Sequence, residues 1–208
     1  MNKAFVINGH QHYPFAPGNL NRALAKRITA YLEARGYETR HTSMTHAYDV
    51  EEEIEKHRWA NLIVLQTPVN WMGVPWSFKK YMDEVYTAGM GGQLCVNDGR
   101  STDAPKKHYG TGGVLNDTRY MLSLTFNAPA EAFGDQNEWF FEGRGVDDLF
   151  WPMHLNFKFF GMSPLPTFAC FDVLKNPQIE SDFVRLEHHL NNHIPLLNKD
   201  LRRQVASA

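Results

Sequence analysis

Short apolar segments that alternate with amphipathic helical segments constrain the fold of this chain more than any other feature. The runs 4–8 and 61–66 are nearly continuous in apolar residues and end at turn residues, as in strands buried on both faces. Helical apolar periodicity follows each of them. Such alternation requires right-handed crossovers, so it predicts an α/β fold with a doubly wound, five-stranded parallel sheet and helices on both faces.

The boundaries of the expected elements lie where this periodicity changes and where Gly or Pro interrupts it. Strands are predicted at 4–8, 37–42, 61–66, 120–125 and 166–173, and helices at 20–36, 50–59, 75–87, 146–160 and 179–197. The stretch 89–113 is rich in Gly, Asp, Lys and Ser, and is predicted to be a long functional or mobile loop. A length of 208 residues fits a single domain, which we expect to span residues 1–208.

Charge, hydropathy and cysteine content exclude several classes of protein. The 21 Lys and Arg nearly balance the 23 Asp and Glu, and no long basic run occurs, so nucleic-acid binding is not expected. No apolar run approaches the roughly 20 residues that span a bilayer, and the segment 4–7 is too short for a signal peptide core. Cys95 and Cys170 are far apart in apolar settings, which predicts two core thiols and a cytoplasmic location.

Ligands of parallel sheets bind at the carboxyl ends of the strands, so three loops matter most. The first, 9–21, lacks the glycine patterns of dinucleotide-binding folds and of nucleoside triphosphatases. Its end, Gly18 to Asn21, begins a predicted helix, and unpaired N–H groups at a helix N-terminus suit a phosphate. The alternative is that Gly18 and Asn19 only cap the helix.

The other two loops carry groups suited to a flat ligand. Trp71 and Trp76 follow the predicted strand 61–66, where exposed indole is costly unless a flat ligand or a partner covers it. The alternative is that both indoles pack into the core. The segment 125–129 offers backbone N–H donors, one hydroxyl and one amide, which can bind the edge of a heterocycle.

Several longer motifs carry a family resemblance. They are the segments 71–76, 79–81, 98–100, 109–113, 120–133 and 161–168. Together they resemble the modulator of drug activity B family, which belongs to the flavodoxin-like NAD(P)H quinone reductases. The resemblance implies an FAD-dependent homodimer that reduces quinones by two electrons, with NADPH as hydride donor, a ping-pong mechanism and the site near the subunit interface.

The resemblance also implies which residues hold FAD. These are Ala16, Pro17, Gly18, Asn19, Leu20, Asn21, Arg22 and Ala23 at the pyrophosphate and ribityl chain, Pro68, Val69, Asn70 and Trp71 along the isoalloxazine, Thr125, Phe126, Asn127 and Ala128 at the ring edge, and Tyr109, which could reach FAD across the dimer. The flavin carries the chemistry, so no catalytic side chain is predicted. Backbone N–H groups of 70–71 and 126–127 are expected to stabilise the charge of the reduced ring.

This chain departs from the family pattern in three places. Relatives commonly have Ser where Ala16 and Pro17 stand, so backbone donors must hold the phosphates here. Relatives can also have Pro-Gly-Trp-Trp in place of segment 68–71, and Trp in place of Phe126. These changes bear on the ring contacts and on the choice of quinone.

Other residue clusters leave alternatives open. His189 and His193 lie four apart and could bind zinc, but without a third ligand a solvated helix face is the preferred interpretation, and no metal site is predicted. His10 and His12 could face a phosphate or lie on the surface. Segment 106–108 could attract the 2′-phosphate of NADPH or be a solvated loop. The aromatic residues of helix 146–160 are expected in the core, with some left for a subunit interface.

Two other functions remain possible on the same fold. The first is an FMN-binding electron carrier of the flavodoxin type, although the nearly neutral charge and the long first loop disfavour it. The second is a binding module without enzymatic activity.

Overall fold

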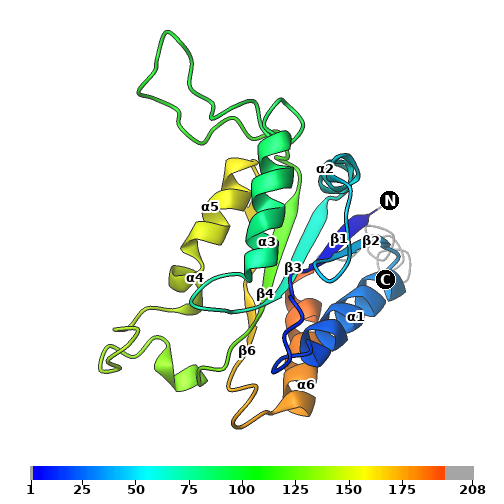
Figure 1. The fold of residues 1–208 in the computed structure, drawn as a ribbon, viewed down its shortest axis with the longest axis vertical. Coiled ribbons are helices and arrows are strands. Elements are labelled where there is room, and N and C mark those ends of the chain that lie inside the picture. The colour runs from blue at the N-terminus through cyan, green and yellow to red at the C-terminus, as the bar shows by residue number, and fades with distance from the viewer. Residues whose placement is uncertain (1, 195–208) are drawn as a thin grey trace, which may run out of the picture.

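A computed structural model describes residues 2–194 of the chain. They form a parallel sheet with helices on both of its faces. The central strands are β1 (Lys3–Asn8), β3 (Leu62–Pro68) and β4 (Arg119–Thr125), with β2 (Glu38–Ser43) beside β1 at one edge. All of these pairs are parallel, and the order β2-β1-β3-β4 continues into two short strands at the other edge (Figure 1). The predicted flavodoxin-like α/β fold is confirmed.

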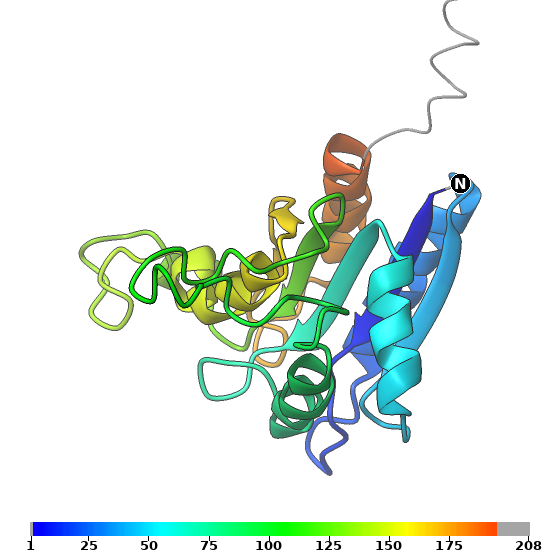
Figure 2. The ribbon, with the colours of Figure 1, turned by 90° about the horizontal axis from the view of Figure 1, so that it is seen from above.

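Alternate residues of the strands face two separate cores. Phe5 and Ile7 pack on one face with α2 (Val50–Trp59), α3 (Trp76–Tyr81) and α5 (Trp151–Phe159). Ala4 and Val6 pack on the other face with α1 (Asn19–Ala34) and α6 (Ile179–His193). Figure 2 shows these two helical layers on opposite sides of the sheet. Burial on both faces explains why the strand sequences are nearly continuous in apolar residues.

The last position of the sheet differs from the predicted strand 166–173. Two strands share it, β5 (Ser163–Pro164) and β6 (Phe168–Cys170), and both pair with β4. Arg119 pairs with Ser163, and Ser123 pairs with Phe168. The edge segment therefore advances five residues where β4 advances four, so it contains one extra residue. The extra residue is a bulge beside Pro166, which has no N–H to donate to the sheet.

Two predicted helices are also altered. The helix expected at 146–160 is divided into α4 (Val146–Leu149) and α5, because Pro152 cannot donate to the carbonyl of Asp148 and the chain turns at Phe150. The helix expected at 75–87 continues from α3 into a π-helix, η1 (Met82–Tyr86). A short 3-10 turn, η2 (Ala130–Ala132), was not predicted. The predicted end of the final helix beyond Ile194 lies outside the described residues.

Candidate functional site

Three loops leave the same edge of the sheet, at the carboxyl ends of β1, β3 and β4. The chain passes from β1 to α1 on one side and from β3 to α3 on the other, so the boundary between β1 and β3 is the point where the strand order reverses (Figure 1). Ligands of doubly wound sheets bind at this point. The loops predicted from the sequence to matter most therefore do lie together.

The loop after β1 ends against the first turn of α1. Gly18 precedes the helix with φ 77°, no side chain caps the helix there, and the first turn contains no acidic residue. The side chain of Arg22 folds back over the loop, donating to the carbonyl of Pro17 at 2.6 Å and to the side chain of Asn19. The first N–H groups of α1 and one guanidinium thus face the end of the loop, which suits an anion.

His10 lies against this helix terminus and is 2% exposed. A Cβ added to Gly18 would lie 2.1 Å from the His10 ring, so only glycine fits beside the imidazole. His10 Nε2 donates to the carbonyl of Ala16 at 3.0 Å, which leaves Nδ1 as the second ring nitrogen, and Nδ1 has no hydrogen-bond partner within residues 2–194. Burial lowers the pKa of His10 below its usual 6.5. The surface interpretation of His10 is wrong.

The loop after β3 is a tight turn that presents an indole to solvent. Asn70 and Gly73 exchange backbone hydrogen bonds of 2.8 and 3.1 Å, and Trp71 and Met72 between them have φ of 49° and 64°. Trp71 is 97% exposed, and Trp76 at the start of α3 is exposed as well. The alternative that both indoles pack into the core is therefore wrong.

The loop after β4 is held to its neighbours on both sides. The carbonyl of Thr125 accepts from the N–H of Val69 at 3.0 Å, and the N–H of Phe126 donates to the carbonyl of Cys170 at 2.8 Å. The ring of Phe126 is buried and stacks on Phe171, with centroids 5.6 Å apart. Phe126 thus belongs to the core rather than to an open ring-binding surface.

These hydrogen bonds correct one prediction about the donors. The N–H groups of Asn70 and Phe126 were expected to face a ligand, but the turn and the sheet already use them. The next residues along the chain, Trp71 and Asn127, are both exposed, so their N–H groups are the remaining candidate donors of the two pairs. The sequence could not show this, because pairing within the turn depends on its backbone conformation.

Tyr109 lies away from these loops within one chain. It is 72% exposed on the long excursion 89–118, which projects from the opposite end of the sheet (Figure 1). Its ring packs on Phe159 at the end of α5, with centroids 5.9 Å apart, and the guanidinium of Arg100 lies 5.7 Å from the ring centroid. The basic segment 106–108 on the same excursion is exposed.

A buried polar network, which the sequence analysis missed, lies beneath the three loops. It contains Asn21 of α1, Gln66 of β3, and Ser123 and Thr125 of β4. Each of these side chains is less than 8% exposed. Polar residues within otherwise apolar strands were the available signal for Gln66 and Ser123.

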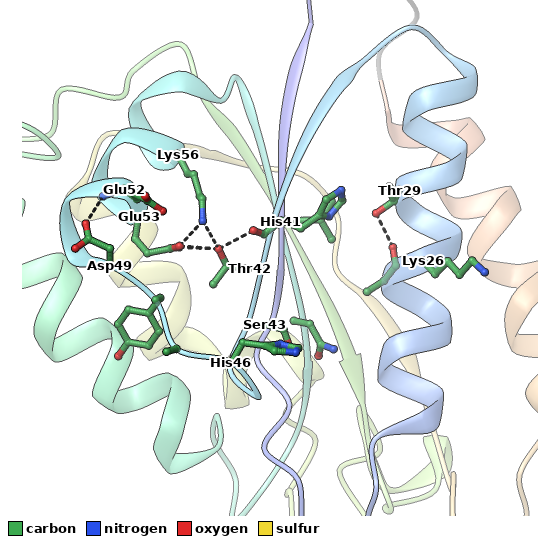
Figure 3. A pocket seen from close by; sticks show the side chains of 15 residues that line it. Lys26, Thr29, His41, Thr42, Ser43, His46, Asp49, Glu52, Glu53 and Lys56 are labelled. Atoms are coloured by element: carbon green, nitrogen blue, oxygen red, sulfur yellow. Dashed lines mark hydrogen bonds and ion pairs between the residues drawn. The ribbon is translucent and has the colours of Figure 1, made fainter.

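A different hollow, of about 750 Å³, lies between α1 and α2 beside β2. Figure 3 shows that Thr42, Glu53 and Lys56 bind one another at one side of this hollow. Glu53, at its floor, accepts from Thr42 at 2.8 Å, from Lys56 at 2.5 Å and from Tyr81 at 2.8 Å. Because the buried carboxylate of Glu53 is fully paired, we interpret this part of the hollow as a structural network.

The other residues considered as possible ligands have structural contacts in the described part of the chain. His189 is half-buried, and its Nε2 donates to the carbonyl of Pro166 at 2.9 Å, so the interpretation as a solvated face is only partly right. Among residues 2–194, no group of three or more His, Cys, Asp or Glu is placed to hold a metal ion. Cys95 and Cys170 are free, buried thiols, as predicted. No helix in this part of the chain is both long and apolar enough to cross a bilayer.

Comparison with known proteins identifies the family. The family described as having a flavodoxin-like fold matches residues 2–194. The NADPH:quinone oxidoreductase MdaB of Haemophilus influenzae is 45% identical over 185 residues, which cover 89% of this chain and 95% of that protein. The chain belongs to this flavodoxin-like family. The resemblance to the modulator of drug activity B family is confirmed.

One further relative and one solved structure extend the comparison. An uncharacterised protein of Schizosaccharomyces pombe is also 45% identical, over 190 residues that cover 91% of this chain and 96% of that protein. A solved structure of a proposed quinone reductase from Klebsiella pneumoniae superposes with a TM-score of 0.74 at 21% identity, covering 92% of this chain and 84% of that one. At that identity the structure supports the fold alone.

Proposed function

We propose that this chain is an NAD(P)H:quinone oxidoreductase that uses FAD. The observation that carries the proposal is the buried, unpartnered Nδ1 of His10 beside the N-terminus of α1, at the point where strand order reverses. The exposed indole of Trp71 lies on the neighbouring loop. One end of the site thus suits a phosphate and the other a flat ring, and the family relative is named for this activity.

The residues present fit a phosphate-bearing flavin. Protonated Nδ1 of His10, the first N–H groups of α1 and the guanidinium of Arg22 would hold the pyrophosphate. These donors replace the Ser hydroxyl that relatives commonly have near Ala16 and Pro17.

At the other end, the turn 69–73 and the segment 125–128 would hold the ring. The flavin itself, when bound, supplies the hydride chemistry between NADPH and the quinone. Trp71 would cover the ring and exclude water, while the N–H groups of Trp71 and Asn127 would orient its polar edge. The nicotinamide of NADPH and the quinone are both flat and would occupy the same face of the flavin in turn, which predicts ping-pong kinetics.

A homodimer with the site near its interface is part of the same proposal. A groove of about 640 Å³ lies between η1 and α5, and its apolar lining includes Met82, Leu155 and Phe159. Tyr109 borders this groove, and the excursion that carries it leaves the end of the sheet opposite the three loops (Figure 1). We infer that a second copy covers the groove and brings its Tyr109 to the site. Two free thiols favour a cytoplasmic location.

Flavin extraction and a turnover assay on one sample test the proposal. Purified protein should be yellow, should release FAD on denaturation, and should oxidise NADPH when menadione is added. Release of FMN instead of FAD would favour the alternative of a flavodoxin-type electron carrier. A protein that stays colourless after incubation with either flavin would favour a binding module without activity.

A further inference from the structure

A continuous line of buried hydrogen bonds crosses the sheet below the candidate site. Ser123 Oγ donates to Gln66 Oε1 at 2.7 Å, and Gln66 Nε2 donates to Asn21 Oδ1 at 2.8 Å. Asn21 Nδ2 then donates to Thr125 Oγ at 3.3 Å. The line therefore joins β4 to β3, β3 to α1, and α1 back to the end of β4.

The bonds of this line depend on one another. The Gln66–Asn21 bond needs one amide nitrogen facing one amide oxygen, so neither side chain can flip alone without losing it. Gln66 and Ser123 are 0% exposed, so water cannot replace a lost partner. Leaving such a group unpaired costs far more than a surface hydrogen bond contributes, and the network therefore resists displacement of any member.

The two ends of the network belong to the two halves of the site. Asn21 lies in the first turn of α1, whose N–H groups would hold the phosphates. Thr125 ends β4, and its carbonyl accepts from the N–H of Val69, which begins the turn that carries Trp71. Movement of α1 toward a phosphate would therefore reach Thr125 directly through the amide of Asn21, and Gln66 holds that amide in the orientation that this bond needs.

We propose that Gln66 is a positioning residue that holds the amide of Asn21 against Thr125 and thereby couples the phosphate end of the site to its ring end. This inference rests on the proposed function. In physical terms, a ligand that fixes the first turn of α1 also fixes Thr125 and the turn 69–73, so the second part of a ligand meets groups already in place. Coupling of this kind is reciprocal, and each fragment of the cofactor should strengthen the binding of the other.

Fragment binding tests the coupling. ADP carries the phosphates without the ring, and riboflavin carries the ring without phosphates. In the wild-type protein, saturating ADP should lower the Kd of riboflavin at least fivefold, measured by quenching of riboflavin fluorescence. In Gln66→Met, which is close in length but forms neither hydrogen bond, this factor should fall below twofold while each fragment still binds alone.

A matched control separates coupling from general loss of stability. Thr118 is also buried and donates one hydrogen bond, to the carbonyl of Ala60 at 3.0 Å. It lies just before the first residue of β4, at the end of the strand away from the candidate site. Thr118→Val should lower the stability of the protein yet retain the full effect of ADP on riboflavin. If Gln66→Met does not fold, Ser123→Ala removes only one bond of the network and should reduce the factor in part.

The possible outcomes separate this inference from the proposed function. If the wild-type protein binds both fragments but neither affects the other, the coupling is disproved and the proposed site stands. Full coupling in Gln66→Met would likewise disprove it. If the wild-type protein binds neither fragment, the proposed function itself fails, and the coupling fails with it.

Discussion

Trp71 is the residue whose exposure is hardest to explain without a ligand. At 97% exposure it contributes little to the core, so Trp71→Ala should leave the free energy of unfolding unchanged. If the indole covers the flavin ring, the same substitution should weaken flavin binding or turnover about tenfold, which corresponds to about 1.4 kcal/mol. Flavin titration and the NADPH-to-menadione rate measure this. Val184→Ala, an exposed apolar residue of α6, is the control.

A variant that lacks the indole and yet binds flavin and turns over as the wild type does would remove Trp71 from the site. A parallel loss in Val184→Ala would show that the assay responds to any change of the apolar surface.

His10 predicts a pH dependence of cofactor binding. Burial holds the pKa of the free imidazole below 6.5, with the charges of Arg22 and His12 acting in the same direction. A phosphate at Nδ1 would favour the protonated ring and raise its pKa, so binding takes up a proton between the two pKa values. FAD affinity should therefore fall as pH rises through this window, by up to about tenfold per pH unit.

Measured Kd values for FAD from pH 5.5 to 8.5 test this, with His10→Asn expected to bind more weakly and with a flatter slope. His188→Asn, on the exposed face of α6, should keep the wild-type slope. Equal slopes in all three proteins would show that His10 does not meet the phosphate.

For single residues, the sequence predicted their places in helices, strands and loops better than their contacts with other residues. It correctly placed Gly18 at the start of a helix and Trp71 and Thr125 at strand ends, because local patterns determine where helices and loops begin. It could not show that the N–H of Phe126 pairs with Cys170, or that Gln66 joins α1 to β4. Those contacts join residues distant in the chain, and they depend on the register of the sheet.

Among the elements, α1 depends most clearly on one residue at its start. Gly18 has φ 77°, and an added Cβ would overlap the ring of His10. Gly18→Ala should therefore lower the free energy of unfolding by at least about 1 kcal/mol and reduce FAD affinity, because the helix terminus or the imidazole must move. Urea unfolding and flavin titration are the measurements.

Gly91→Ala provides the comparison for Gly18→Ala. At Gly91 an added Cβ would meet only the end of the Gln93 side chain, at 3.4 Å. Its stability should stay close to that of the wild type. Equal stability of Gly18→Ala and Gly91→Ala would mean that the loop before α1 adapts without cost.

The elements that the sequence predicted less well share a physical cause. Pro152 is a signal that the helix expected at 146–160 is interrupted, but the helical apolar periodicity continues on both sides of Phe150 and so favoured one unbroken helix. The bulge at Pro166 depends on pairing with β4, which no local pattern encodes. The π-helix brings Tyr81 and Tyr86, five residues apart, around His57, with ring centroids 6.1 and 5.6 Å from the imidazole. Tertiary packing of this kind overrides the local preference for an α-helix.

For the whole molecule, assembly into a dimer is the main prediction. Light scattering after size exclusion should give twice the 23.9 kDa mass of one chain. Leu155→Asp places a charge in the groove between η1 and α5, and should give monomers that bind flavin less tightly, since Tyr109 of a second copy is lost. Val184→Asp, on α6, should remain dimeric. A monomeric wild-type protein that turns over fully would contradict the prediction.

The organisation of residues 1–208 as one domain stays a prediction.

The placement of sulfur has a chemical consequence for an enzyme of this kind. Quinones are electrophiles that alkylate accessible thiolates. The chain has only two cysteines, both 0% exposed, and burial raises the pKa of the Cys95 thiol and raises that of Cys170 to about 12. Thiols that are neither reachable nor ionised react slowly. Such a protein could process toxic, arylating acceptors through many turnovers without inactivating itself.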